Sequence, residues 1–181
     1  KVEDSEVIEE GMTLKVSYKE VSKEFNISLV KVYKEYAATG MTAEAGSFQP
    51  NNNTEGNGNL ALDNNLNTMW HTNWNGCQRS ETWITIDMKK EQNVAMLKYT
   101  PRQGGGTNGN ITAYEIYVSK DGQTWGEPVA TGTWANNNVV KYARFDTVLG
   151  RYVKLVATDS ASQEASKIFA SAAEIRSGFE E

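Results

Sequence analysis

The stretch that decides the fold is Tyr114-Glu-Ile-Tyr-Val-Ser-Lys-Asp-Gly122. Its first five residues alternate, so that Tyr114, Ile116 and Val118 share one face of a predicted β-strand. The Asp121-Gly122 pair that follows is a turn signal and predicts that the chain reverses into a hairpin. An alternating strand that runs into a Gly-containing turn is typical of an antiparallel sheet.

The same pattern recurs on both sides of this stretch. Further strands are expected at Thr82–Asp87, Val94–Tyr99, Val139–Phe145 and Tyr152–Ala157. Clusters of Gly and Asn at 51–59, 104–110 and 136–138 mark the loops between them. Short, regularly spaced strands with rich turns predict an all-β protein, an antiparallel β-sandwich of jelly-roll type with almost no helix from Met41 to Gly178. The long Asn/Gly loops are expected to gather at one end, where binding loops usually lie.

The beginning of the chain has a different composition, rich in Lys and Glu and without Gly clusters. Two alternating runs, 12–18 and 25–29, are separated by a possible turn over 19–23, and together they predict a β-hairpin. They resemble the last strands of a bacterial Ig-like linker module. The alternative is a helical linker around residues 30–38. The predicted organisation is therefore an N-terminal extension, residues 1–39, followed by a main domain, residues 40–178.

Composition excludes several classes of protein. The 181 residues are 39% hydrophobic and 23% charged, an ordinary globular balance for one domain with an appendage. The net charge of -5, without a basic stripe, argues against binding to nucleic acid or to anionic lipid. No apolar run approaches the length of a membrane span, so membrane insertion is not expected. Cys77 is the only cysteine, which excludes an internal disulfide and argues against a small disulfide-stapled scaffold. Residue 1 is Lys rather than Met, so a fragment of a longer protein is expected.

One loop concentrates the residues that suggest chemistry. It runs from Leu60 to Trp74 and contains the only histidine, His71, with a tryptophan on either side. Asp63 and Thr68 supply oxygen donors just upstream. Aromatic faces beside fixed polar groups suit a sugar ligand, and clustered oxygen ligands in a tight loop suit a hard cation such as calcium.

Several motifs follow one another in a characteristic order. They are Ala61-Leu-Asp-Asn-Asn-Leu-Asn-Thr-Met-Trp-His71, Glu81-Thr-Trp-Ile-Thr-Ile-Asp87, Tyr99-Thr-Pro-Arg-Gln103, Asn108-Gly109, Tyr114–Gly122 with Trp125, Phe145–Leu155 and Ala172-Ala-Glu-Ile175. In order and spacing they resemble the factor V/VIII type C, or discoidin-like, superfamily, and within it the family 32 carbohydrate-binding modules of bacterial secreted glycosidases. One departure is Asn64, where the family usually has Gly; Asn tolerates the left-handed backbone, so the turn is expected to survive.

The resemblance implies a discoidin-like, galactose-binding-domain-like sandwich that binds carbohydrate and is not an enzyme. Its expected ligands are glycans with terminal galactose or N-acetylgalactosamine. It would hold a parent glycoside hydrolase, secreted or on the bacterial surface, near its substrate, alongside other modules of the parent chain. The alternatives are another sugar, such as N-acetylglucosamine or a plant polysaccharide, and an adhesion domain for protein or phospholipid. Adhesion would require apolar spikes beside basic residues, whereas these loops are rich in Asn and Gly.

For the sugar site, the resemblance points to His71, Arg102 and Asn108 as polar contacts. A histidine accepts or donates to the axial 4-hydroxyl of galactose, and a guanidinium bridges two vicinal hydroxyls. The remaining expected contacts are Glu55 as a hydroxyl acceptor and Trp74 and Phe169 against the apolar sugar face.

Each polar contact also has a structural interpretation. The histidine would be a satisfied structural residue beside Trp, the arginine a surface ion pair, and Asn108-Gly109 a turn. Trp70, Trp83 and Trp125 are expected in the core.

For calcium, the expected side-chain ligands are Asp63, Thr68 and Glu174, because carboxylate and hydroxyl oxygens suit this ion. Glu174 joins them on the resemblance, in which the first and last strands are neighbours. The backbone carbonyls of Ala61, Asn65 and Ala173 would complete a structural site away from the sugar. The alternative is an Asx-turn in which Asp63 caps its own loop without metal.

A catalytic role is not predicted. The sequence shows no Ser/His/Asp order, phosphate loop or zinc-ligand spacing, although carboxylates are numerous enough for a glycosidase pair. Cys77 lies six residues after His71 and raises the question of a thiol nucleophile. No third group that would orient such a pair is evident.

Overall fold

The computed structural model describes residues 13–26 and 31–181, in two compact units, Lys1–Val32 and Tyr33–Glu181. In the first unit, β1 (Thr13–Tyr18) and β2 (Val21–Asn26) form an antiparallel hairpin that turns at Lys19, whose φ is 55°. This confirms the predicted hairpin, with a shorter turn than 19–23. Residues 27–29 of the expected second strand lie outside the described residues.

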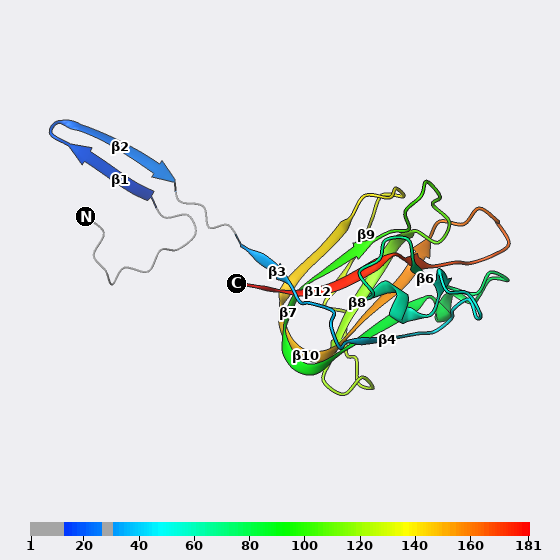
Figure 1. Cartoon of the computed structure of the whole chain (residues 1–181). Helices are drawn as coiled ribbons and strands as arrows, with labels where there is room; N and C mark the ends of the chain where they lie inside the picture. Colours follow the sequence, from blue (N-terminus) through cyan, green and yellow to red (C-terminus); the bar gives the residue numbers. More distant parts are fainter. Residues whose placement is uncertain (1–12, 27–30) are drawn as a thin grey trace. The chain divides into compact units, whose positions relative to one another are not determined.

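The second unit is built almost entirely from strands (Figure 1). They are β3 (Tyr33–Glu35), β4 (Thr42–Ala45), β5 (Glu55–Gly56), β6 (Met69–His71), β7 (Trp83–Thr100), β8 (Ile111–Ser119), β9 (Ala130–Thr133), β10 (Lys141–Ser160), β11 (Ser171–Ala172) and β12 (Glu174–Glu180). Two short 3-10 helices, η1 (Gly58–Ala61) and η2 (Arg79–Glu81), are the only helical turns among the described residues, which confirms the all-β prediction. No helix in this part of the chain is long and apolar enough to cross a membrane.

The segment before the main sheet is extended. The alternative of a helical linker is wrong over 31–38, because β3 pairs with β12, with Tyr33 opposite Glu180. The second unit therefore begins at Tyr33, a few residues before the expected boundary at 39 and 40.

Two long curled strands, β7 and β10, form the frame of the sandwich (Figure 1). The sequence predicts two short strands within each of them. In the structure the first half of β7 pairs with the second half of β10, with Ile84 opposite Leu155, and the remaining halves pair with Tyr99 opposite Lys141. Each long strand thus belongs to both layers. β4, β8 and β9 complete one layer, and β12 and β3 complete the other.

An ion pair fastens the bend in these two strands. Asp87 accepts hydrogen bonds from Arg151 Nε at 2.8 Å and Nη2 at 2.9 Å, and from the Lys89 backbone N–H at 2.8 Å. The guanidinium holds the pKa of the Asp87 carboxyl well below its usual range. Lys89 has a left-handed φ of 66°, and the register of β10 shifts between Gly150 and Tyr152. The polar segment after Asp87 is therefore a bend within one strand rather than a loop between two.

The core lies between the two layers and follows the predicted alternation. The expected inward-facing residues Tyr114, Ile116 and Val118 are all buried. Trp70 is also fully buried, as predicted, and its Nε1 donates to the Ser47 carbonyl at 2.9 Å. Other fully buried side chains are Ile84, Ile86, Val94, Leu97, Tyr99, Ile111, Val153, Leu155 and Ile175.

The predicted core positions of Trp83 and Trp125 are wrong. Both side chains are only partly buried, and both border a hollow on the outer face of the sheet. Trp83 precedes the inward-facing Ile84 in a strand, so it must point outward. Trp125 lies in the loop after β8, outside the sandwich.

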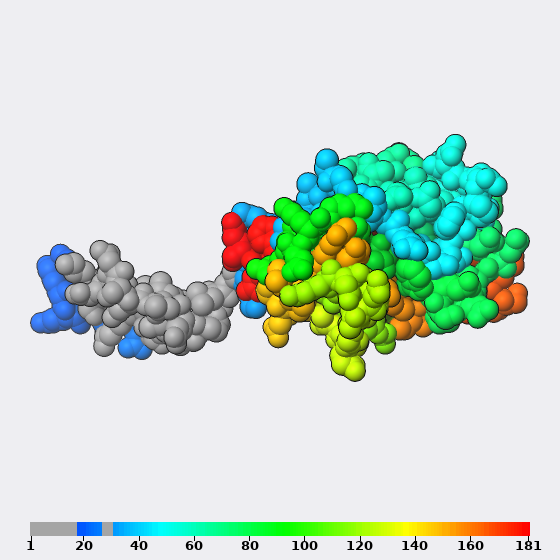
Figure 2. All heavy atoms as spheres, turned by 90° about the horizontal axis from the view of Figure 1, so that it is seen from below, coloured from blue at the N-terminus to red at the C-terminus, as the bar shows by residue number. Residues whose placement is uncertain are grey.

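The Asp121-Gly122 turn forms within a longer loop than a tight hairpin requires. Gly122 has a φ of 73°, and Asp121 Oδ1 accepts from the backbone N–H groups of Gln123 and Thr124, both at 2.8 Å. Residues 120–129 then lead to β9, which pairs antiparallel with β8. Seen from below, this loop is the yellow-green projection in Figure 2.

A substitution at the centre of the sheet tests the path of β10. Leu155 is 1% exposed and lies opposite both Ile84 and Ile116, so Leu155→Ala should lower the free energy of unfolding by about 2–5 kcal/mol. Leu149, on the same strand, is 46% exposed, and Leu149→Ala should cost less than about 0.5 kcal/mol. Denaturant titration measures both changes, and similar costs for the two variants would contradict this fold.

Candidate functional site

A small second sheet gathers the candidate sugar residues at one end of the sandwich. β5 pairs parallel with β6, with Glu55 opposite Met69, and β6 pairs antiparallel with β11, with His71 opposite Ser171. The three strands come from distant parts of the sequence. Their pairing therefore brings Glu55, His71 and the loops beside them together.

His71 is held as a neutral hydrogen-bond acceptor. The residue is 1% exposed, and its Nδ1 lies 2.7 Å from the Thr72 carbonyl oxygen. Because a carbonyl only accepts, Nδ1 carries the proton and Nε2 keeps its lone pair. Burial lowers the pKa of His71, which favours this neutral form. Nε2 has no hydrogen-bond partner within the described residues.

Arg102 lies beside the histidine with part of its guanidinium unsatisfied. Nη2 pairs with Glu55 Oε1 at 3.1 Å, and Nη1 donates to the Asn108 carbonyl at 3.3 Å. Nε is buried and has no partner in the described part of the chain. Glu55, which is predicted to accept from a sugar hydroxyl, therefore orients Arg102. The alternative prediction of an ion pair at Arg102 is thus met, but the pair is partly buried rather than on the surface.

Asn108 and Gly109 form the turn that closes the site. Asn108 Oδ1 accepts from the Gln163 backbone N–H at 3.0 Å, so its Nδ2 remains a donor without a partner among the described residues. Gly109 has a φ of 81°, and a Cβ there would lie 2.8 Å from Ser171 Oγ. Only glycine fits this position, so the turn and the candidate ligand role of Asn108 coexist.

The two candidate aromatic contacts have different environments. Trp74 is 45% exposed, and its backbone is held by Gln49 Oε1 at 3.0 Å. Phe169 is 2% exposed and packs against the imidazole of His71 with ring centroids 5.6 Å apart. Trp74 is thus the open aromatic face, while Phe169 supports the histidine in this conformation; its contact with sugar stays a prediction.

Strand pairing recruits residues that sequence reasoning missed. Thr72 fixes the histidine tautomer, and its Oγ1 accepts from the Ala170 N–H at 3.0 Å. Ser171 Oγ donates to the Asn108 carbonyl at 3.3 Å. In the sequence, only its position next to His71 points to a role for Thr72, and nothing in the pattern points to Ser171.

Cys77 does not have the environment of a nucleophile. Its thiol donates to the Ile168 carbonyl at 3.4 Å, and burial raises the pKa of the thiol, which disfavours a nucleophilic thiolate.

The candidate calcium residues also converge. Asp63 Oδ2 accepts from Thr68 Oγ1 at 2.7 Å. The Asn65 backbone N–H is shared by Asp63 Oδ1 at 2.9 Å and Glu174 Oε1 at 3.0 Å. The Asp63 bond to this N–H is the predicted Asx-turn. The turn and the clustering of the predicted ligands therefore occur together.

Arg176 is an unpredicted member of this cluster. Its Nη1 pairs with Glu174 Oε2 and donates to the Ala61 carbonyl at 3.3 Å, while its Nη2 donates to Asn64 Oδ1 at 2.7 Å. The sequence could have indicated this neighbour, because Glu174 and Arg176 are two residues apart on one strand and therefore share a face. Asn64 has a φ of 62°, which confirms the predicted left-handed turn.

The side-chain oxygens of this cluster are too few to coordinate a hard cation alone, so backbone carbonyl oxygens would have to complete the ligand set. No group of three or more His, Cys, Asp or Glu side chains within residues 13–26 and 31–181 could hold a metal. The available oxygen ligands are the carboxylates of Asp63 and Glu174, the hydroxyl of Thr68 and the carbonyls of the loop, and such a set suits calcium. Ala173, the last expected ligand, directly precedes Glu174 and donates its N–H to the Thr100 carbonyl at 2.9 Å.

Residues 42–175 match the F5/8 type C domain. The chain belongs to the F5/8 type C family. Solved structures similar to this F5/8 type C domain include two carbohydrate-binding modules of Clostridium perfringens. CpGH89CBM32-5, in complex with GalNAc-β-1,3-galactose, is 32% identical with a TM-score of 0.70, over 81% of this chain and 99% of that one. The family 32 module of NanJ, in complex with galactose, is 32% identical with a TM-score of 0.67 over the same shares. The predicted family and discoidin-like sandwich are confirmed.

Curated relatives of this F5/8 type C domain are much longer proteins. Galactose oxidase of Gibberella zeae is 46% identical over 106 residues, which are 58% of this chain and 16% of that protein. The A type blood N-acetyl-α-D-galactosamine deacetylase of Flavonifractor plautii is 34% identical over 143 residues, 76% of this chain and 18% of that protein. The chain therefore spans less than a fifth of the length of these relatives.

The titration of His71 gives a test of its environment in the F5/8 type C domain. A lowered pKa in the folded state means that the unfolded state binds the proton first, so stability is full above about pH 6.5 and falls as the pH drops below it. The slope should approach, at most, about 1.4 kcal/mol per pH unit. Denaturant titrations at several pH values between 8 and 5 measure it.

The control uses the fact that the protein has a single histidine. In His71→Gln the loss of stability between pH 7 and pH 5 should be smaller than in the wild type. Parallel profiles for the two proteins would show that burial does not perturb this histidine.

Proposed function

We propose that this domain binds terminal galactose or N-acetylgalactosamine and keeps a parent secreted enzyme near glycans that carry these sugars. The observation that carries the proposal is the meeting of a neutral histidine acceptor, an unsatisfied arginine and an open tryptophan at one loop end. The ligands named for the two Clostridium perfringens modules support the same class of sugar.

The unsatisfied groups match the hydroxyls of galactose. The axial 4-hydroxyl donates to His71 Nε2 and accepts from the Arg102 guanidinium, whose remaining donors reach a neighbouring hydroxyl. Asn108 Nδ2 supplies a further donor. Because the 4-hydroxyl is axial, the opposite face of the ring is apolar and rests on Trp74. Glucose, with an equatorial 4-hydroxyl, does not reach the same acceptor.

One such site binds a monosaccharide weakly, and several sites acting together bind a glycan surface more strongly. A few net hydrogen bonds of about 0.5–1.5 kcal/mol each, with one aromatic contact of similar worth, leave a dissociation constant on the order of micromolar to millimolar after the cost of association. Retention on a glycan surface then comes from several modules acting together. This arrangement suits a targeting module in a longer chain.

The domain acts in this proposal without catalysing a reaction. The thiol of Cys77, the candidate nucleophile, is partly buried and donates a hydrogen bond to the Ile168 carbonyl. Glu55, the acidic residue at the site, forms an ion pair with Arg102. The proposed setting is a secreted or surface-attached bacterial protein, in which other modules carry the catalytic activity. The similarity to short parts of long carbohydrate-active relatives supports this organisation.

Substitution of the polar contacts tests the sugar site. His71→Ala or Arg102→Ala should abolish measurable galactose binding, and Trp74→Ala should weaken galactose and N-acetylgalactosamine alike by about tenfold, because stacking reads the shape of the ring. Titration calorimetry with galactose, N-acetylgalactosamine and glucose measures these effects. Equal affinity of the wild type for glucose and galactose would refute the role given to the axial hydroxyl.

A matched control separates the site from a general loss of positive charge. Arg144 is exposed on β10 and contacts only aromatic rings among the described residues. Arg144→Ala should therefore leave galactose binding unchanged, and a comparable loss in this variant would count against the Arg102 assignment.

We also propose that Asp63, Thr68 and Glu174, with the carbonyls of Ala61, Asn65 and Ala173, hold a structural calcium ion. The ion would neutralise two carboxylates that now share one N–H group and would fix the loop that leads to His71. Binding it requires the Arg176 guanidinium to give up part of its contact with Glu174 and Ala61.

Calcium removal tests this second proposal. An ion present at a hundred times its dissociation constant stabilises the folded state by about 2.7 kcal/mol, so a chelator should lower the melting temperature by several degrees. Asp63→Asn should abolish this response, whereas Asp121→Asn, at an Asx-turn in another loop, should retain it. A melting temperature unchanged by chelator would mean that Arg176 is the permanent cation of the loop.

A further inference from the structure

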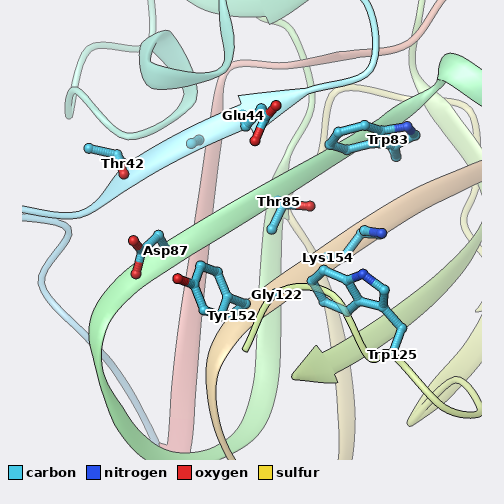
Figure 3. A pocket seen from close by; sticks show the side chains of 10 residues that line it. Thr42, Glu44, Trp83, Thr85, Asp87, Gly122, Trp125, Tyr152 and Lys154 are labelled. Carbon is cyan, nitrogen blue, oxygen red and sulfur yellow. The ribbon is translucent and has the colours of Figure 1, made fainter. Parts of the chain in front are cut away.

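A hollow of about 260 Å³ lies on the outer face of the sheet (Figure 3), and none of its lining residues belongs to the candidate galactose site. Three aromatic side chains border it, Trp83, Trp125 and Tyr152. Thr85 and Lys154 lie among them and supply polar groups. The hollow therefore combines aromatic and polar side chains as a sugar site does, although the sugar proposal above makes no use of it.

Strand register places the polar groups in one row. Glu44 on β4 is opposite Thr85 on β7, and Thr85 is opposite Lys154 on β10. Residues that are opposite one another in paired strands point to the same face, and Figure 3 shows all three on the side of the hollow. A carboxylate, a hydroxyl and an ammonium group are thus held on three strands of one layer.

Two glycines allow the walls to stand close to the backbone. A Cβ at Gly46 would lie 2.5 Å from Trp83 Nε1, so the indole edge occupies the space of the missing side chain. Gly122, with a φ of 73°, would bring a Cβ within 3.2 Å of the Tyr152 ring. The Trp83 and Tyr152 side chains therefore pack against the backbone at Gly46 and Gly122, so these two walls of the hollow are in place without a ligand.

Two polar groups of the hollow, those of Thr85 and Lys154, lack hydrogen-bond acceptors among the described residues. Thr85 Oγ1 is buried and makes no hydrogen bond within the described residues. Lys154 Nζ lies 3.9 Å from the centre of the Trp125 ring and 5.3 Å from that of Trp83, without an ion pair in the described part of the chain. A buried hydroxyl and an ammonium group that both lack acceptors indicate a site for an acceptor.

The balance of charge favours an anion as that acceptor. Asp87 at the edge of the hollow is already paired with Arg151 and Lys89. Arg151 and Lys89 do not line the hollow, whereas Lys154 does line it. Together these residues set three positive charges against the carboxylates of Asp87 and Glu44, in a chain whose net charge is -5. Glu44 is exposed at the rim, whereas Lys154 is partly buried, so the inner end of the row is cationic.

We propose that this hollow is a second carbohydrate site, which binds one sugar residue that carries a carboxylate. The carboxylate accepts from Lys154 Nζ and Thr85 Oγ1, and the ring lies against the aromatic walls. The hollow is smaller than the pockets that enclose drug-sized ligands, and its size fits a single pyranose ring. This site is independent of the galactose proposal, because the two share no residue.

The experiment is a titration followed by the indole N–H signals in nitrogen-15-labelled protein. D-glucuronate should shift the signals of Trp83 and Trp125 and leave that of Trp74 in place. D-glucose, which has a hydroxymethyl group in place of the carboxylate, should shift neither at the same concentration. Acetate at that concentration, which tests the carboxylate alone, should also shift neither. Equal shifts with glucose would overturn the role of charge, and equal shifts with acetate would overturn the role of the sugar ring.

Two substitutions test the donors, and a third is the control. Lys154→Met keeps the aliphatic stem and should weaken glucuronate binding at least about tenfold, because bonds between charged groups are the stronger ones. Thr85→Val, which keeps the side-chain shape, should weaken it by a smaller factor of several-fold. Lys90→Met removes an exposed lysine outside the hollow and should change nothing. Absence of glucuronate shifts in the wild type, or equal affinity in Lys154→Met and Lys90→Met, would overturn the proposal.

Discussion

The architecture depends on the bend that the Asp87–Arg151 ion pair fastens in β7 and β10. Because both strands pass through both layers, one pair of hydrogen-bonded strands connects the whole sandwich. The bend lies at one end of the domain, and β6, the strand that contains His71, lies toward the other (Figure 1). The ion pair therefore links β7 to β10 at the point where both strands pass from one layer to the other.

The candidate galactose site is built by backbone pairing more than by its side chains. The β5–β6–β11 sheet sets the position of His71, and the Thr72 carbonyl then selects its tautomer. Gly109 permits the contact with Ser171 that places Asn108. Arg102 is oriented by Glu55. The groups left over, Nε2 of the histidine and Nε of the arginine, are a complementary acceptor and donor in a fixed arrangement, which lowers the entropic cost of binding.

Side-chain periodicity predicted the fold well, and its failures have physical causes. Alternation identified the inward faces of β8 and β10, because a half-buried strand must alternate. The same rule places Trp83 outside, since Ile84 is inside, so the expected core position of Trp83 disagreed with the alternation of its own strand. The charged run after Asp87 has the composition of a turn, and only the ion pair across the sheet shows that it is a bend. The contact of Ser171 with Asn108, and those of Arg176 with Ala61 and Asn64, join distant segments that local sequence does not encode.

The antiparallel pairing of β3 with β12 has a mechanical consequence. Tyr33, the first residue of the second unit, lies opposite Glu180 of β12, so these two residues lie at the same end of one strand pair. A pulling force applied through the chain at these two points would load the hydrogen bonds of that pair one after another, as in a zipper, rather than all at once in shear. The β3–β12 pair would open first at low force, and the layers behind it would stay closed. The β3–β12 pair would thus act as a compliant joint when the domain is pulled at Tyr33 and Glu180.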